Sequence, residues 1–319
     1  MQKAFSLLLA GAILGATRTA IVWAGADSSL ILGPAAPESA DPATRASPPP
    51  SAAGTLDSQA NLDVATVEAG LAEFFATRFS AHEPIYYLAG AEEPEAKFQI
   101  SLKYQLFNPE GTMVPKNPWL TDLYLAYSQT SFWDLGKSNS SPFFDSSYRP
   151  ELLYQVESPT ASWLGQSRFD FQAGVQHESN GKDGLDSRSI NIVYIRPIFT
   201  WGDDGTRGSR DFFLTFAPRL WSYWGDTDEN PDIYRYRGYG DLKVIAGWRS
   251  GMQAAATVRM GNDFDKGSLL LDLSYPLRGI SSRNLDLYLH AQLFTGIGES
   301  LLEYDQSDTP FRVGMSLVR

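Results

Sequence analysis

KFQISLKYQLF, residues 97–107, alternates between polar and apolar side chains almost to its end. Apolar residues occupy the even positions from Phe98 to Leu106, and lysine, glutamine or serine occupies each odd position from Lys97 to Gln105. Successive side chains of a β-strand point to opposite faces of the sheet. The stretch therefore predicts a strand with one apolar and one polar face.

The same period of two recurs along the rest of the chain, with apolar rows over residues 123–127, 212–216, 242–248, 269–275, 285–293 and 311–317. Such strands reach roughly ten residues, the length that crosses a bilayer at a tilt. A soluble β-sandwich would also alternate, but its strands average about five or six residues. We count about ten or eleven strands, and closure of a bacterial barrel favours an even number. The sequence therefore predicts an all-β fold, a twelve-stranded antiparallel transmembrane β-barrel.

Composition excludes several classes of protein. The chain has 319 residues and no cysteine, so disulfide and thiolate chemistry are excluded. Its 37 acidic and 26 basic residues give a net charge of −11, and binders of nucleic acid need a basic surface. Beyond the N-terminus no stretch is apolar for the ~18 residues that a membrane helix requires. We therefore expect neither a nucleic-acid partner nor a helical membrane protein.

The N-terminus has the features of an export signal. Lys3 precedes an apolar run over residues 5–16, and Ala24-Gly25-Ala26 has the small-x-small pattern of a cleavage site. An uncleaved anchor helix is the alternative, but the apolar run is short for a membrane span. We expect a signal peptide over residues 1–26.

Three further segments follow. Residues 27–63 are rich in Pro, Ala and Ser and predict a disordered linker. Residues 64–94 predict a short helix and a lead-in, because Val67, Leu71, Phe74 and Phe75 stand at helical spacing. Residues 95–319 are expected to form the barrel.

One hairpin carries unusual polar residues. The segment FQAGVQHESNGKDGLDSRSINIVYIRP, residues 171–197, predicts a strand, a loop and a strand. If Phe171 and Val175 face lipid, parity turns His177 and Ser179 to the same side. Polar groups are costly at mid-membrane and cheap at its rim, so this pair is expected at the end of the strand.

The return strand supplies a third polar group. If the hairpin is symmetric about Gly184, His177 opposes Asn191 and Ser179 opposes Ser189, and opposed residues share a face. Serine, histidine and asparagine can then act as nucleophile, base and orienting group in attack on an acyl ester. The alternative is an inert H-x-S in an ordinary strand.

These residues resemble the outer-membrane phospholipase A family. The family's hallmark, H-x-S-N-G followed by S-R-S-x-N, is matched at residues 177–181 and 187–191. Further matching motifs stand in the same order at residues 129–133, 140–143, 229–233 and 296–301. The resemblance covers the chain from about residue 85 to its end.

The resemblance implies a calcium-dependent homodimer in the bacterial outer membrane that hydrolyses phospholipid acyl esters, a phospholipase A1/A2. It implies Ser179 as nucleophile, His177 as base, Asn191 as orienting residue and the Gly181 amide in the oxyanion site. It also implies calcium ligands shared between subunits, namely Ser140, the Lys182 carbonyl, Ser187 and Glu229. This chain departs from the family in the loop: Lys182 replaces an arginine, and an acid expected near residue 184 is absent. Asp183 and Asp186 are its nearest substitutes.

Gln129 is the expected dimer contact. It shares a face with Leu123, Leu125 and Tyr127, so its amide points at lipid and needs a partner. A twin glutamine from a second barrel, as in the family's dimer, would supply one. The alternative is a residue at the rim that meets water.

Two other functions remain open from the sequence. A non-catalytic outer-membrane barrel, a pore or structural protein, would keep the scaffold without the chemistry. A soluble secreted esterase would require the apolar rows to form a core.

Overall fold

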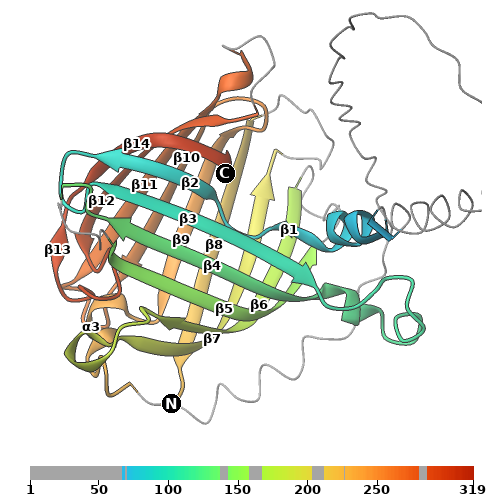
Figure 1. The fold of residues 1–319 in the computed structure, drawn as a ribbon, viewed down its shortest axis with the longest axis horizontal. Helices are drawn as coiled ribbons and strands as arrows, with labels where there is room; N and C mark the ends of the chain where they lie inside the picture. Colours follow the sequence, from blue (N-terminus) through green and yellow to red (C-terminus); the bar gives the residue numbers. More distant parts are fainter. Residues whose placement is uncertain are drawn as a thin grey trace, which may run out of the picture. The chain divides into compact units, whose positions relative to one another are not determined.

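The alternating stretches form one antiparallel sheet that closes on itself (Figure 1). The computed structural model describes residues 67–68, 70–136, 143–157, 167–202, 212–225, 227–279 and 286–319. The predicted signal peptide and linker, together with residues 64–66, lie outside the described residues.

The strands follow one another around the barrel in chain order. Their bounds are β1 Phe79–Ala81, β2 Ile85–Gly90, β3 Ala96–Gln105, β4 Leu123–Trp133, β5 Phe143–Glu157, β6 Ser167–Ser179, β7 Ser189–Trp201, β8 Phe212–Tyr223, β9 Gly240–Trp248, β10 Gln253–Met260, β11 Gly267–Pro276, β12 Tyr288–Ile297, β13 Ser307–Asp308 and β14 Phe311–Val318. Short helices are η1 Pro118–Asp122, η3 Gly184–Asp186, α3 Ile233–Arg237 and η4 Leu277–Gly279. Residues 67–68 and 70–78 are also helical.

The prediction of twelve strands is confirmed. β1 and β2 both pair with β3 and form one strand interrupted at residues 82–84. β13 and β14 both pair with β12, so they likewise count as one. The predicted domain boundary at residue 95 is too late, because β2 joins β14 to β3 and completes the closure. A closed barrel also excludes the soluble β-sandwich.

The outer face is apolar over its whole circumference. Its exposed side chains include Ile100, Leu102, Leu125, Leu152, Val175, Leu214, Phe216, Leu220, Val258, Leu271, Leu273, Leu289, Val313, Met315 and Leu317. Aromatic pairs stand at both ends of the strands: Trp133 and Phe143 at one, and Phe212 and Trp248 at the other. An apolar band between two aromatic girdles is the surface that a membrane barrel presents to lipid.

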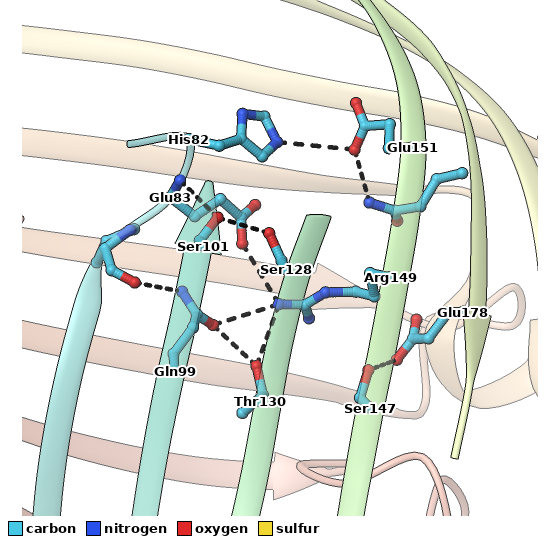
Figure 2. Close-up of polar contacts among 12 residues, drawn as sticks. His82, Glu83, Gln99, Ser101, Ser128, Thr130, Ser147, Arg149, Glu151 and Glu178 are labelled. Carbon is cyan, nitrogen blue, oxygen red and sulfur yellow. Dashed lines mark hydrogen bonds and ion pairs between the residues drawn. The ribbon is translucent and has the colours of Figure 1, made fainter. Parts of the chain in front are cut away.

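The inner face is polar and internally bonded. Figure 2 shows Arg149 of β5 reaching across β4, where it donates hydrogen bonds to Glu83, Gln99 and Thr130 at 3.4, 3.2 and 3.1 Å. The interruption between β1 and β2 turns His82 inward, 3.7 Å from Glu151. Because buried polar groups are costly unless paired, this network fixes which side of each strand faces the lumen.

An apolar cluster lies inside one end of the barrel. Ile190 and Ile192 of β7 pack with Ile233 of α3 and with Leu301 and Tyr304 of the loop after β12. We call this the site end, because the predicted catalytic residues lie there, and the opposite one the termini end, because β1 starts and β14 finishes there. Within the described residues, no helix is long and apolar enough to span a membrane.

Candidate active site

The β6–β7 hairpin has the predicted register. His177 pairs with Asn191, and Ser179 pairs with Ser189. The odd residues of β6 face outward, since Val175 is 41% exposed, whereas Gln176 and Glu178 are buried. β6 ends at Ser179. The outward polar residues thus stand where the lipid-facing wall stops, as the parity argument requires.

Two of the predicted catalytic residues are bonded to each other. The distance between His177 Nδ1 and Asn191 Oδ1 is 2.9 Å. An amide oxygen can only accept, so Nδ1 donates in this bond, and in the neutral imidazole Nε2 is the nitrogen without a proton. Ser179 stands two residues further along the same face, and no hydrogen bond within the described residues joins it to His177. Such contacts are often loose until substrate binds.

Gly181 has a conformation that other residues rarely adopt. Its φ is +68°, and a Cβ added there would stand 3.0 Å from the Tyr148 ring. Among the described residues its amide donates to no backbone oxygen. An amide without a backbone acceptor is the kind of donor that an oxyanion hole uses.

The loop between the strands is held by residues that the sequence analysis did not single out as site residues. Asn180 Oδ1 accepts from the amides of Lys182 and Arg188 at 3.3 and 3.0 Å, and its Nδ2 donates to the Asp186 carbonyl at 2.8 Å. Asn230, fully buried, accepts from the Ser189 amide at 3.0 Å. Both asparagines lie in motifs that match the family, at residues 177–181 and 229–233. The sequence alone assigned no role to either of them.

The structure brings two of the predicted calcium ligands together. Ser187 Oγ donates to Glu229 Oε1 at 2.8 Å, although the two residues come from different loops. Lys182 follows Gly181 in the same loop, and its Nζ donates to the Phe144 carbonyl at 2.7 Å. The fourth predicted ligand, Ser140, lies outside the described residues. Hydroxyl, carboxylate and carbonyl oxygens on exposed loops fit calcium.

Behind the site, the inner face supplies a buried ion pair. Glu178, between His177 and Ser179, accepts from Arg237 of α3 at 3.2 and 3.1 Å and from Ser147 Oγ at 2.8 Å. Figure 2 shows Glu178 and Ser147 meeting inside the wall. Arg237 also donates to the Ser300 carbonyl at 3.1 Å. The catalytic strand is thereby tied to α3 and to the loop after β12.

That loop carries a second ion pair at its base. Burial alone would raise the pKa of the Glu299 carboxyl, but Lys97 at 3.0 Å and Arg312 at 2.8 Å hold it below its ordinary value. Asp145 accepts from the Leu302 amide at 2.9 Å. The matched motif at residues 296–301 therefore packs the loop onto the site end.

Gln129 differs from the expectation in one respect. It does share the outward face of β4, but its amide already has partners within the chain. Tyr127 donates to its Oε1 at 2.9 Å, and its Nε2 donates to Ser131 Oγ at 3.1 Å. Residues two apart on a strand share a face, so the amide is satisfied without a second barrel.

Known proteins are similar to this chain in sequence and in fold. The family model for Phospholipase A1 matches residues 75–317. The chain is 32% identical over 231 residues to phospholipase A1 of Escherichia coli (strain K12), covering 71% of this chain and 71% of that protein. Phospholipase A1 of Klebsiella pneumoniae is 31% identical over 231 residues, with the same coverage of both chains, 71%.

Two solved structures have the same fold. The outer membrane phospholipase A of Escherichia coli superposes with a TM-score of 0.60 at 26% identity and covers 75% of this chain and 91% of that one. The Salmonella typhi outer membrane phospholipase, a dimer with bound calcium, gives 0.61 at 25% identity and covers 75% and 92%. The non-catalytic and soluble alternatives therefore fall away. The chain belongs to the phospholipase A1 family, outer-membrane β-barrels that hydrolyse acyl esters.

Proposed function

We propose that the protein hydrolyses phospholipid acyl esters with Ser179 as nucleophile, His177 as general base and Asn191 as orienting residue. The observation that carries the proposal is the 2.9 Å bond between His177 Nδ1 and Asn191 Oδ1 beside Ser179, at the end of a lipid-facing strand. The substrate reaches this patch by lateral diffusion, because the patch opens onto the membrane rather than into the lumen.

The proposed reaction has two halves, acylation of Ser179 and hydrolysis of the acyl-serine. The Ser179 hydroxyl attacks the ester carbonyl while His177 Nε2 takes its proton. The carbonyl oxygen becomes negative and accepts the Gly181 N–H. His177 then gives the proton to the departing lysophospholipid oxygen, which leaves an acyl-serine. Water, deprotonated by the same nitrogen, attacks the acyl-serine; fatty acid departs, and Ser179 regains its proton.

Calcium would bind at the Ser187–Glu229 pair, with the Lys182 carbonyl and Ser140 as further ligands. The pair offers two oxygens joined at 2.8 Å, and an oxygen site on loops is the kind that calcium takes. When bound, the ion supplies positive charge beside the oxyanion, which neutral Asn191 does not.

A homodimer through β4 is the proposed active form. The ladder puts Gln129 opposite Tyr148, and Tyr148 opposite Ser179, on consecutive strands. Adjacent strands are about 4.8 Å apart, so Gln129 and Ser179 are separated by about 10 Å across the wall. A second barrel packed on Gln129 would therefore border the catalytic serine and help to form the acyl groove. The Salmonella typhi homologue, a calcium-bound dimer, supports this arrangement.

The test is fatty-acid release from a long-chain phosphatidylcholine in detergent, with calcium or with a chelator. We expect hydrolysis only with calcium, and none by Ser179→Ala. Ser189→Ala is the matched control, because Ser189 opposes Ser179 on the same face. Equal release by wild type and Ser179→Ala would remove the proposed nucleophile, and full activity under chelation would remove the proposed metal.

A further inference from the structure

The N-terminal helix, residues 67–68 and 70–78, exposes its apolar face. Val67, Leu71, Phe74 and Phe75 recur at helical spacing, and they are 61%, 51%, 42% and 52% exposed. Glu73 lies on another side of the helix. A helix that packed into a protein core would bury such a stripe. Here the stripe stays 42–61% exposed, although the helix belongs to the same compact unit as the barrel.

The helix touches the outer wall of the barrel through aromatic rings. Phe74 lies 6.2 Å from Tyr104, Phe75 lies 5.6 Å from Phe79, and Phe79 lies 5.0 Å from Tyr104. Between helix and wall runs an apolar groove of about 440 Å³. Its other walls are Leu102 and Tyr104 of β3 and Leu125 and Tyr127 of β4.

The register fixes where this groove lies. Phe79 pairs with Tyr104, at the termini end of β3, so the groove lies at the end of the barrel opposite the catalytic residues. Figure 1 shows the helix, in blue, at the end away from α3. The girdle at that end also contains exposed Trp201, Phe212 and Trp248. The groove is thus continuous with the lipid-facing surface of an outer-membrane barrel and level with the zone where acyl chains meet headgroups.

We infer that this N-terminal helix lies in the membrane interface, and that in the monomer acyl chains of the leaflet at the termini end fill the groove between the helix and the barrel. An amphipathic helix with Leu and Phe on one side and a carboxylate such as that of Glu73 on another lies in the plane of an interface, its apolar side among the acyl chains. The family model begins at residue 75, so most of this helix precedes the matched region. The inference does not depend on the catalytic assignment.

The chain's lack of cysteine makes the test direct. Leu71→Cys, on the apolar stripe, and Glu73→Cys, on the polar side, each introduce a single thiol for a fluorescent label. Each full-length variant is folded into phosphatidylcholine vesicles with or without bromine on the acyl chains. Iodide, a quencher confined to water, is present on both sides of the membrane. Fatty-acid release by each labelled variant confirms that the barrel is folded.

We expect brominated lipid to quench the Leu71→Cys label several-fold more than the Glu73→Cys label, and iodide to show the reverse order. Equal quenching of both labels by iodide, with none by bromine, would overturn the inference, because the helix would then stand in water. Shielding of the Leu71→Cys label from both quenchers would overturn it in another way. In that case a second copy of the chain, rather than lipid, covers the stripe.

Discussion

The two faces of the β6–β7 hairpin make opposite use of polar residues. On the outer face His177 and Asn191 are half-buried and share a single hydrogen bond of 2.9 Å. On the inner face Glu178 is buried and bonded to both Arg237 and Ser147. The residues alternate along the same strands, so one face can be kept rigid while the other stays accessible to lipid.

The difference shows how a site on a lipid-facing wall can be positioned. A polar side chain on the outer face, such as that of His177, has few hydrogen-bond partners within the described residues. Its geometry comes from the buried side of the same backbone, where paired charges and the apolar cluster around Ile190 and Ile192 fix the strands. The chemistry and the positioning of the catalytic groups therefore depend on different residues. Substitutions on the outer face should mainly lower kcat, and those on the inner face should mainly lower the free energy of unfolding.

The largest contrast is between two histidines. His177→Ala removes the proposed outer-face base and should lower kcat by roughly 10⁴- to 10⁶-fold, the loss seen when the base of a serine hydrolase is removed. His290→Gln is the matched control, because His290 lies on the inner face, 2.9 Å from Asp272. It should leave the activity of the folded barrel near wild type. A comparable loss of kcat in the two variants would contradict the division between the faces.

Two glycines give the next contrast. Gly181→Ala forces a side chain onto a φ of +68° with the Tyr148 ring 3.0 Å away, and moves the oxyanion donor. We expect a fall in kcat of about 10²- to 10³-fold, as for loss of one such donor. Gly184 has a similar φ of +61° but open space around it, so Gly184→Ala introduces the backbone strain without a steric clash. Steady-state kinetics on both variants separates the two effects, and equal losses would argue against the Gly181 amide.

Asn191→Ala tests the bond that orients the imidazole. Without it His177 can rotate or change tautomer, and a misplaced base costs about 10²-fold in kcat. KM should change little, since Asn191 touches the base rather than the lipid. Asn191→Asp keeps an acceptor for Nδ1 and should restore much of the rate. Failure of the aspartate variant to exceed the alanine variant would mean that the orienting bond is unimportant.

The smallest effect on the rate is expected from the inner face. Arg237→Met leaves the Glu178 carboxylate buried without its cation, which should cost about 3–5 kcal/mol in the free energy of unfolding. The folded fraction should lose about tenfold in activity or less. Adding Glu178→Met removes the stranded charge and should recover most of the stability, measured by denaturant titration in detergent. If the single and double variants unfold alike, the ion pair does not hold the hairpin.

Much of this was accessible from the sequence. The alternation around Phe98 predicted the barrel, and symmetry about Gly184 predicted the pairing of His177 with Asn191. β2 was missed because IYYLAG is apolar on both faces, Tyr86 buried and Tyr87 exposed, so no alternation marks it. The contacts that could not be predicted are mostly between residues far apart in the sequence. Glu178 and Arg237 are 59 residues apart, and the five-residue helix α3 leaves no periodic signal.

Gln129 shows a different limit. The alternation of β4 correctly predicted that the Gln129 amide points outward. The expectation of a partner from a second barrel did not take into account the side chains two residues away on the same face. Tyr127 and Ser131 satisfy the amide, and both were visible in the sequence at a spacing of two.

The most direct measurement is the position at which a long-chain fluorophosphonate, a covalent probe for activated serines, attaches to the calcium-loaded protein in detergent. The outward Ser179–His177–Asn191 site predicts one adduct, on Ser179 Oγ with loss of fluoride, located by mass spectrometry and abolished in His177→Ala. An adduct on another residue such as Ser189, or no adduct on protein that is hydrolysing phospholipid, would contradict it.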